Sequence, residues 1–357
     1  MIHRSIKKSA VAALAMSTIL GGTAAMADLN EIQLQVVVGN HTDVFTVNQV
    51  VPFFEQLSDA SDQAISAHTV SYTTLGLSGF EMMDLLRLGT NDISWGVPGY
   101  IAGEAPVVEG MELPGLTGDS SVMFKIQDAY RDLFNEQLGE HFNARLMGWS
   151  QQPALQAYCR LEDDELENFS LATMKGLSVR VHSTTFSDFA ESMGAIPVTM
   201  PFADVIPALE RGVIDCAITS PSAAYGYGIG QVANAVVDVH AGYSTHFYAM
   251  NLDTWNGLNE ETQSFLTEQF AKVEQDMRDY TPEVEATMAA CLTDGPCEAG
   301  EPSGMTFVQL SEEDSADLRE RVESVVVPRW AKRAGKDAEA QWNATAGQVL
   351  GMSISAE

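Results

Sequence analysis

Several polar and aromatic side chains lie in turns near apolar stretches, where they could contact a small ligand. Asn40 and His41 follow the apolar run 32–38, which predicts a β-strand. In open α/β sheets, ligands bind beyond the carboxyl ends of the strands. We therefore expect ligand contacts from two groups of residues. The first group lies early in the chain and comprises Asn40, His41, Thr74 and Trp95; the second lies later and comprises Gln156, Tyr158 and Tyr243. Tyr243, like Tyr225 and His246, has the alternative of being a half-buried structural residue.

The sequence motifs that would indicate catalysis are missing from this chain. Ser78 lies in the segment Gly76-Leu-Ser-Gly79, which lacks the Gly-x-Ser-x-Gly pattern of a nucleophile elbow. The glycine-rich segment 226–230 does not have the spacing of a dinucleotide-binding loop. The seven histidines form no His-Glu-x-x-His motif, and His41 and His246 would be a catalytic pair only by assumption. We expect a protein that is not an enzyme and needs no cofactor.

The N-terminus has the pattern of a secretory signal peptide over residues 1–27. Basic residues within 4–8 precede the apolar stretch 11–20, and the triplet 25–27 is an Ala-x-Ala cleavage site. The apolar stretch is too short to span a membrane. No cysteine follows the cleavage site, as a bacterial lipid anchor would require. We expect a mature chain that begins near Asp28 and is soluble outside the cytoplasm.

The chain is strongly acidic, with a formal net charge of −30 at pH 7 over 357 residues. The charged side chains of the signal peptide are all basic at neutral pH, so its removal makes the net charge of the mature chain more negative still. Such a charge disfavours binding to nucleic acid and to anionic membrane surfaces. It does not set the sign of a small ligand, because one local arginine can still hold an anion. The length of the mature chain is sufficient for two domains.

The four cysteines favour disulfide bonds over metal binding. An even number of cysteines in an exported chain is typical of disulfide bridges. The short loop from Cys291 to Cys297 contains Gly295-Pro296, which can form the turn of one bridge, and this leaves Cys159 to pair with Cys216. Zinc binding is the alternative, but no pair of histidines lies near the cysteines, so we expect no metal site.

A sequence pattern that occurs twice indicates which elements position the expected ligand contacts. The pattern Leu-x-x-Gly-x-x-Asp occurs at 86–92 and again at 209–215, each time after apolar residues at helical spacing. The glycine can adopt the left-handed conformation that ends a helix. The apolar segments 93–97 and 213–218 then predict buried parallel strands. Two copies indicate two α/β lobes of related design that hold a ligand between them; the alternative is chance recurrence of an ordinary helix-to-strand junction.

Further elements follow from apolar periodicity and from capping residues. Asn259 can cap a long helix in which Leu266, Phe270 and Met277 recur at helical spacing, and Pro282 is expected to bend it. The remaining predicted strands are 65–72, 145–149, 156–159 and 175–182, and the remaining predicted helices include 45–58 and 311–325.

Two segments, 174–181 and 193–215, closely resemble the solute receptors of tripartite ATP-independent periplasmic (TRAP) transporters, of the dicarboxylate-receptor type. The turn 89–92 with the following Trp95-Gly-Val-Pro-Gly-Tyr100, and Leu146-Met-Gly-Trp149, are similar to the same family. The resemblance covers nearly all of the mature chain. It implies an α/β fold of two lobes with mixed sheets, closing like a flytrap, and a long helix that spans both lobes. We expect the first lobe to comprise 28–150 and 241–282, and the second 151–240 and 283–357.

The resemblance also implies a function in the periplasm. A TRAP receptor binds a small organic acid by its carboxylate and delivers it to the membrane permease subunits, which use an ion gradient. The expected partners are therefore the acid and the permease, and the family default is a monomer. The alternative is a receptor that serves a sensor or an ABC-type importer, which would use the same two-lobed fold with a different partner.

Site residues carried over from the family centre on Arg180, which occupies the position of the arginine that pairs with the ligand carboxylate. A guanidinium matches the two oxygens of a carboxylate and stays charged. Phe202 matches an aromatic residue that walls the carboxylate, with a core phenylalanine as the alternative. Arg160 lies near a second basic position, although it has the alternative of a surface pair with Glu162 or Asp163.

This chain departs from the family after Asp215. Many relatives have Gly-Gln-Glu-Asn there, whereas this chain has Cys216-Ala-Ile-Thr219-Ser220, so Thr219 or Ser220 must replace the missing amide. The resemblance implies a subgroup in which a bridge from Cys159 to Cys216 fastens two strands under the ligand. Aromatic residues near the expected site favour an apolar or aromatic carboxylate over a compact diacid.

Overall fold

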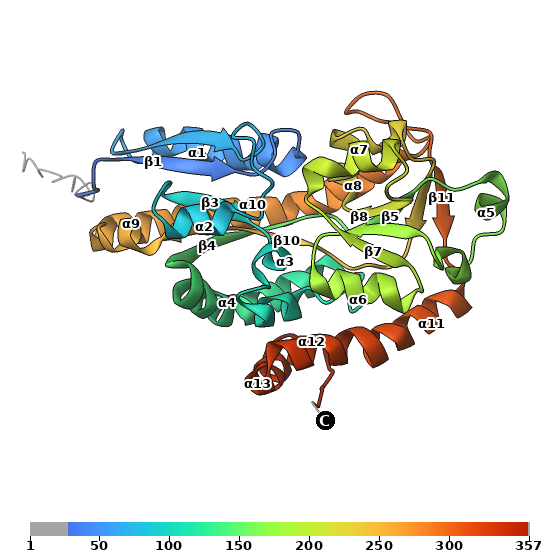
Figure 1. Cartoon of the computed structure of the whole chain (residues 1–357). Coiled ribbons are helices and arrows are strands. Elements are labelled where there is room, and N and C mark those ends of the chain that lie inside the picture. The colour runs from blue at the N-terminus through green and yellow to red at the C-terminus, as the bar shows by residue number, and fades with distance from the viewer. Residues whose placement is uncertain (1–27, 356–357) are drawn as a thin grey trace, which may run out of the picture.

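The computed structural model describes residues 28–355 and contains two β-sheets side by side (Figure 1). The first sheet has the strand order β2-β1-β3-β10-β4, formed by Ile65–Ser71, Ile32–Val38, Ile93–Gly96, Thr245–Asn251 and Ala144–Gln151. The second has the order β11-β9-β5-β8-β6-β7, formed by Thr306–Gln309, Ala235–Asp238, Gln156–Cys159, Cys216–Thr219, Ser178–Val181 and Ile196–Thr199. The predicted signal peptide, residues 1–27, lies outside the described residues.

Each sheet is mixed, and each contains one strand brought in from a crossover. In the first sheet β1 is parallel to β2 and β3, whereas β10 is antiparallel to β3 and β4. In the second sheet β6 is parallel to β7 and β8, whereas β5 is antiparallel to β8 and β9. The chain passes to the second sheet between β4 and β5 and returns between β9 and β10. The predicted two-lobed mixed α/β fold is confirmed.

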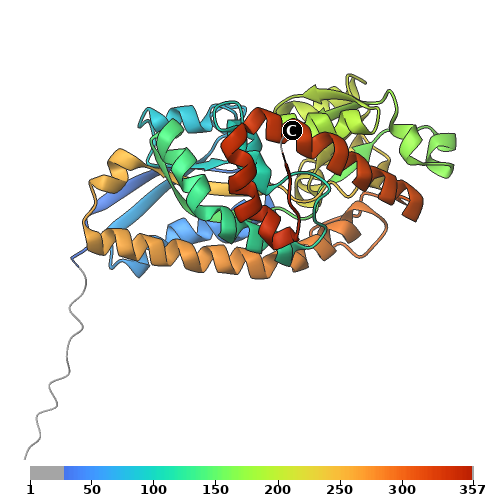
Figure 2. The ribbon, with the colours of Figure 1, turned by 90° about the horizontal axis from the view of Figure 1, so that it is seen from below.

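The predicted long helix is α10, Glu260–Leu292, which runs along the molecule from one lobe to the other (Figure 2). The side chain of Asn259 caps it by accepting a hydrogen bond from the Thr262 N–H at 2.8 Å. Its buried face packs on β4 of the first sheet and on α8, Pro221–Gly226, beside the second. The helix continues through Pro282.

Both copies of the repeat end a short helix as predicted. The helices are α2, Met82–Arg87, and α7, Val205–Glu210, and the glycines after them, Gly89 and Gly212, have φ of 69° and 66°. These values lie in the left-handed region, which glycine adopts without strain. The strand after the second copy was predicted from residue 213 but begins at Cys216, because Val213 belongs to the turn and is 56 % exposed.

The aspartate of each copy ties its strand to the neighbouring parallel strand. Asp92 Oδ2 accepts a hydrogen bond from the Gln35 N–H of β1, and Asp215 Oδ2 accepts one from the Ser178 N–H of β6, both at 2.7 Å. In return, the N–H of each aspartate donates to the carbonyl of the same partner at 2.8 Å. The spacing of the repeat is therefore the spacing needed to end a helix and start a paired strand.

The other helices cover the sheets. They include α1 (Val51–Ala60), α3 (Pro98–Ile101), α4 (Ser120–Phe142), α5 (Asp163–Glu167), α6 (Thr184–Ser192) and α9 (Leu252–Asn256). The helix predicted over 45–58 has a π-helical first part, Thr46–Val50, and then continues as α1. The helix predicted over 311–325 is α11, Glu312–Arg321, followed by a π-helical segment, Val322–Val326.

The C-terminal segment connects the two lobes. Strand β11 joins the second sheet, whereas α12 (Val327–Ala334) packs on the segment Pro106–Met111 and α14 (Ala346–Leu350) packs on α4. Arg329 of α12 also forms ion pairs with Asp188 and Glu191 of α6. The helix α13, Lys336–Ala344, lies between them (Figure 2). The predicted lobe boundaries, including 283–357 in the second lobe, stay a prediction.

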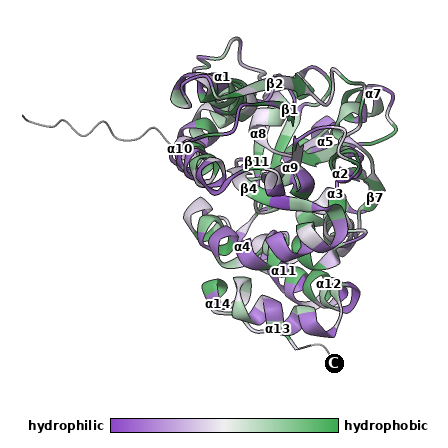
Figure 3. Ribbon diagram, turned by 90° about the vertical axis from the view of Figure 1, so that its left-hand side faces the viewer, coloured by the Kyte–Doolittle hydropathy of each residue, from purple (hydrophilic) through white to green (hydrophobic). Residues whose placement is uncertain are grey.

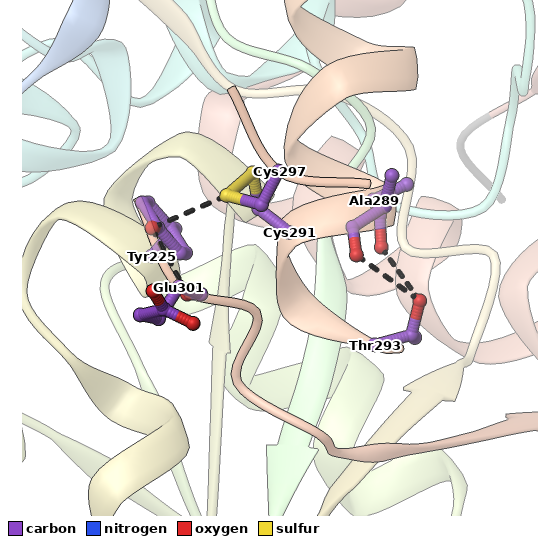
Figure 4. The surroundings of a disulfide bond; sticks show 7 residues. Tyr225, Ala289, Cys291, Thr293, Cys297 and Glu301 are labelled. Carbon is purple, nitrogen blue, oxygen red and sulfur yellow. Dashed lines mark hydrogen bonds between the residues drawn. A yellow bond between two sulfur atoms is a disulfide. The ribbon is translucent and has the colours of Figure 1, made fainter. Parts of the chain in front are cut away.

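Both predicted disulfides are present. Cys159 and Cys216 are directly paired positions of β5 and β8 and are bonded to each other. Cys291 and Cys297 are bonded at the end of α10 (Figure 4), where the Tyr225 hydroxyl lies 3.2 Å from Cys297 Sγ and donates to the Glu301 carbonyl at 3.1 Å.

Outward-facing helices such as α11 and α13 are mostly hydrophilic (Figure 3). Within residues 28–355, no helix is both long enough and apolar enough to cross a membrane. In the same part of the chain, no group of three or more His, Cys, Asp or Glu side chains is placed to share a metal ion.

Candidate functional site

A cavity of about 80 Å³ lies where the carboxyl ends of strands from both sheets face each other. This volume could hold roughly five water molecules, which is a size suited to a small organic molecule. Its walls come from segments that follow β1, β2, β3, β6, β7 and β8 and from the crossovers, as expected for ligand sites in open α/β sheets. The lining residues are Gly39, Asn40, Asp43, Thr46, Tyr72, Trp95, Val97, Tyr100, Gln152, Leu155, Arg180, His182, Phe202, Thr219, Ser220, Ala223, Tyr227, Ser244 and His246.

Arg180 supplies a buried positive charge on the second-sheet side of this cavity. Its side chain is only 2 % exposed, and it donates from Nε to the Met200 carbonyl at 3.1 Å and from Nη1 to the Ile218 carbonyl at 3.2 Å. Within residues 28–355, its Nη2 is buried without a hydrogen-bond partner. Burial lowers the pKa of Arg180, but a guanidinium remains charged in proteins. The arrangement therefore leaves a charged donor that an anion in the cavity would satisfy.

Phe202 lies beside the guanidinium, and Tyr227 packs on Phe202. The guanidinium carbon lies 5.4 Å from the centre of the Phe202 ring, within the range of a cation–π contact. The Phe202 and Tyr227 rings meet edge to face with centres 4.5 Å apart. Burial raises the pKa of Tyr227 to about 12, so this hydroxyl stays protonated at neutral pH.

The first-sheet side of the cavity is aromatic. Trp95, at the end of β3, stacks on Tyr72 with ring centres 5.0 Å apart and an interplanar angle of 4°. The His246 ring meets the indole edge to face, also at 5.0 Å. Gly39 is required beside this wall, because a Cβ there would lie 2.8 Å from Thr46 Oγ1. The result is a flat apolar surface opposite the arginine.

Gln152 joins the two sides of the cavity at the crossover between β4 and β5. Its amide nitrogen donates to Asp43 Oδ2 and lies within hydrogen-bond distance of His246 Nδ1, both at 3.2 Å. Its amide oxygen accepts from Ser220 Oγ at 3.0 Å and from Ser222 Oγ at 2.7 Å. These four contacts use the full hydrogen-bonding capacity of the amide. Gln152 therefore fixes the first-sheet side against the second.

Asp43 is the acidic residue of the cavity wall. Its Oδ1 accepts from the Thr46 N–H at 2.9 Å and from Thr46 Oγ1 at 3.2 Å, and its Oδ2 accepts from Gln152. Burial raises the pKa of Asp43, and the hydrogen bonds from Thr46 and Gln152 oppose that rise because they favour the charged carboxylate.

Two histidines line the cavity in the neutral form. Burial lowers the pKa of His246 to about 3 and lowers the pKa of His182 well below its usual value, with the charge of Arg180 adding to the effect on His182. At neutral pH these two histidines therefore add no charge to the lining, in which Arg180 is the basic residue and Asp43 the acidic one.

The cavity contains half of the residues that the sequence predicts as ligand contacts. These residues are Arg180, Phe202, Thr219, Ser220, Asn40 and Trp95. They come from both sheets and from segments more than 100 residues apart, so the structure brings the two groups of the prediction together. Their contact with a ligand stays a prediction.

The structure places the other predicted contacts away from the cavity. Arg160 is exposed and donates from Nη1 to the Leu209 carbonyl at 2.9 Å, in an open surface hollow. It forms no ion pair with Glu162 or Asp163 among the described residues. Arg160 follows the end of β5 opposite to the end that borders the cavity, so it lies outside this cavity, and its contact with a ligand stays a prediction.

The remaining displaced residues have ordinary structural positions. His41 and Thr74 are exposed at the tips of the turns that follow β1 and β2. Gln156 is half-buried in β5, and Tyr158 is fully buried in a core cluster with Leu209. Tyr243 donates to the Gly118 carbonyl at 3.2 Å and packs on another part of the first lobe.

The sequence-based prediction missed about two thirds of the residues that line the cavity. Tyr72 follows β2 directly, so the strand-end rule that selected Asn40 could have found it. Asp43 lies three residues beyond Asn40 and could have been found in the same way. Tyr100, Gln152 and Tyr227 carry no comparable signal, because their positions depend on how loops from the two lobes meet.

Comparisons with known proteins agree with this geometry. The sequence model of the bacterial extracellular solute-binding proteins, family 7 (DctP), matches residues 40–333. The chain is 26 % identical to the 2,3-diketo-L-gulonate-binding periplasmic protein YiaO of Escherichia coli K12 over 234 residues, which cover 64 % of this chain and 67 % of the relative.

Two solved structures illustrate the likeness of the fold. DctP7 of Bordetella pertussis, an extracytoplasmic solute receptor that binds pyroglutamic acid, has a TM-score of 0.76 at 23 % identity, over 88 % of this chain and 99 % of that one. A TRAP periplasmic solute-binding protein of Sulfurospirillum deleyianum with bound succinate has a TM-score of 0.77 at 16 % identity, over 88 % and 99 %. At these identities the likeness shows a common fold.

Proposed function

Because this chain belongs to the bacterial extracellular solute-binding proteins, family 7, as TRAP receptors do, we propose that it binds a small organic acid by its carboxylate at Arg180. The observation that carries the proposal is the Nη2 of Arg180, which is buried beside a cavity and has no partner within residues 28–355. An uncompensated buried charge is costly, and a ligand carboxylate would supply its counter-ion.

The geometry supports a receptor that closes around its ligand. Arg180 and Ser220 belong to the second-sheet side, Trp95 and Asp43 belong to the first-sheet side, and Gln152 bonds to both sides at the crossover. An acid bound to Arg180 would contact the aromatic wall only when the lobes are together, as in hinge closure around a ligand. Closure would also remove water and strengthen the ion pair.

The chain would then deliver the acid to membrane permease subunits without changing it chemically. The family is one of binding proteins, and the cavity wall offers a cation, hydroxyls and aromatic rings for holding a carboxylate. We propose that the receptor acts as a monomer.

The test is a calorimetric and thermal-shift screen of the mature chain, residues 28–357, against a panel of organic acids, with mass spectrometry of any acid that copurifies. Arg180→Lys keeps the charge but loses the planar fork, so affinity for the best acid should fall by roughly tenfold or more, about 1.4 kcal/mol. Arg160→Lys is the matched control and should bind as the unchanged chain does. Failure of every acid to bind, or equal effects of the two substitutions, would refute the proposal.

A further inference from the structure

The cavity carries a second charged group that binding of a simple carboxylate does not use. Arg180 is the positive residue of the lining, and Asp43 is the negative one. The two do not form an ion pair: Arg180 bonds to carbonyls and Asp43 bonds to Thr46 and Gln152. They come from different sheets, Arg180 from β6 and Asp43 from the turn after β1. A ligand in the cavity therefore meets a positive group on one side and a negative group on the other.

Asp43 has an unused acceptor position. An ionised carboxylate has about four lone-pair positions for hydrogen bonds. Thr46 donates twice, both times to Oδ1, and Gln152 donates once to Oδ2; a hydrogen bond from the Phe45 N–H also favours the carboxylate. The side chain is 8 % exposed and lines the cavity. Oδ2 is thus left with capacity for one donor, and the space beside Asp43 that is free of protein is the cavity.

The charges of the lining also limit the ligand. Arg180 can neutralise one carboxylate, and the histidines of the lining are neutral. A second carboxylate on the ligand would find no cation in the wall and would lie in the same closed space as Asp43. Like charges in a buried site strongly disfavour each other, and an unpaired buried charge is costly. A ligand group that donates a hydrogen bond would meet the free position on Oδ2 instead.

We propose that Asp43 is a specificity-determining residue that selects monocarboxylic acids bearing an N–H or O–H donor away from the carboxylate, and rejects dicarboxylic acids. The inference rests on the proposed function, because it requires the carboxylate to be at Arg180. It works both by attraction to the donor and by repulsion of the second carboxylate, as specific sites commonly do.

Asp43 also has a structural role, which the test has to separate from recognition. Its Oδ1 caps the helical segment that begins after it, through the Thr46 N–H. Asparagine caps helices about as well as aspartate does. Asp43→Asn therefore keeps the cap and the size of the side chain while removing the charge, which makes it the informative variant; its Nδ2 takes the place of the oxygen that accepts from Gln152, so this one hydrogen bond is lost as well.

The experiment uses pairs of ligands that differ in one group. Succinate and succinamate have the same skeleton, with a carboxylate in one and an amide in the other; glutarate with glutaramate, and terephthalate with 4-carbamoylbenzoate, extend the set to a longer and an aromatic skeleton. Calorimetry measures each affinity for the mature chain, for Asp43→Asn and for the control Asp163→Asn. The side chain of Asp163 is exposed at the start of α5.

We expect the unchanged chain and Asp163→Asn to bind the amide of a pair at least tenfold more tightly than the diacid. Asp43→Asn should shift that ratio by at least tenfold toward the diacid, while the variant stays folded and its melting temperature falls only by the loss of the Gln152 hydrogen bond. Equal or better binding of the diacid by the unchanged chain, or an unchanged ratio in Asp43→Asn, would overturn the inference. A dicarboxylic acid found by mass spectrometry as the copurifying ligand would do so too.

The failure of this inference is distinguishable from the failure of the proposed function. If acids bind and the effect of Arg180→Lys is present but the amide-to-diacid ratio does not depend on Asp43, only the specificity role is lost. If neither amides, diacids nor any other acid of the panel bind, the carboxylate site at Arg180 is refuted and the role of Asp43 falls with it.

Discussion

The first and second lobes contain the same local construction, a helix end followed by a paired strand, built from different residues. In the first lobe, Asp92 bonds to Gln35 and the next pairs are Val36 with Ile93 and Val37 with Ser94. In the second lobe, Asp215 bonds to Ser178 and the next pairs are Val179 with Cys216 and Arg180 with Ala217. Counted from the aspartate, the register is identical in the two lobes.

Val37 and Arg180 are therefore equivalent positions of the two constructions. Val37 is 5 % exposed in the apolar core, whereas Arg180 is 2 % exposed with its Nη2 beside the ligand cavity. The comparison shows that the repeat determines the backbone arrangement of the helix end and the paired strand. It does not determine which side chain occupies the equivalent position, and so it does not determine what that position can bind. In the proposed function, the arginine at this position is what gives the strand end in the second lobe an anion-binding role, whereas the valine in the first lobe packs in the core.

The largest effect should come from placing the arginine in the wrong lobe. Val37→Arg would bury a charge in the first lobe without a ligand pocket or a partner, and should destabilise the fold by about 4 kcal/mol or more. Thermal or chemical unfolding of the mature chain would measure it. A variant that remains as stable as the unchanged chain would show that the two positions have different surroundings and that the equivalence is wrong.

The reciprocal substitution should separate binding from stability. Arg180→Val should weaken acid binding by about 3–5 kcal/mol, a loss of several hundredfold or more, because the ligand carboxylate loses its partner. The unfolding midpoint should stay the same or rise, because an unpaired buried charge is replaced by an apolar side chain. Calorimetry and thermal unfolding of the same sample test both parts, and strong destabilisation with retained binding would contradict the comparison.

The second lobe has a disulfide where the first lobe has none. Cys216 occupies the position of Ile93 and is bonded to Cys159 across 57 residues of sequence, whereas Cys291 and Cys297 are six residues apart. A disulfide that closes a longer loop restricts the unfolded chain more, so Cys159→Ala with Cys216→Ala should cost about 4 kcal/mol of stability. Cys291→Ala with Cys297→Ala should cost about 2 kcal/mol. Denaturant unfolding measures both, and the opposite order would reject this explanation.

The two aspartates should have comparable effects on stability. Asp92→Ala and Asp215→Ala each leave a backbone N–H without its acceptor, so each should reduce stability by about 1–2 kcal/mol, with Asp92→Ala at the upper end because it also removes the acceptor of the Thr254 hydroxyl. Denaturant unfolding of the two variants should give similar losses, and calorimetry should show acid affinity nearly unchanged, because neither aspartate lines the cavity. Loss of affinity in only one variant would mean that its aspartate does more than pair strands.

The smallest effect concerns the neutral histidines, one in each lobe. Because the folded pKa of His246 is lowered to about 3, the unfolded chain binds more protons below its ordinary pKa of 6.5. This contribution to stability is therefore present above pH 6.5 and is lost as the pH falls toward the folded pKa. It amounts to about 1 kcal/mol between pH 6.5 and about 5.5. His246→Asn, whose side-chain oxygen can accept from Gln152, should lose less stability over that range in thermal unfolding. An identical pH dependence would contradict the assignment.

Local patterns in the sequence were enough to determine the scaffold. The spacing of Leu, Gly and Asp predicted both helix ends and both paired strands, because these depend on bonds between near neighbours and on the conformational freedom of glycine. Asn259 likewise predicted the start of the long helix, and the even number of cysteines predicted the disulfide bonds. The position of Arg180 at a strand end came from the resemblance and was found at the cavity.

Only the tertiary structure decided which strand ends face each other. Tyr158 lies in β5 and Arg160 directly follows it, at the end of this antiparallel strand that points away from the cavity, and no local pattern states that direction. Gln152, Tyr100 and Tyr227 reach the cavity because the crossovers bring the two lobes together. Contacts between segments so distant in sequence depend on the packing of the whole chain. For this reason local sequence patterns determined the elements of each lobe, whereas only the tertiary structure determined which side chains line the cavity.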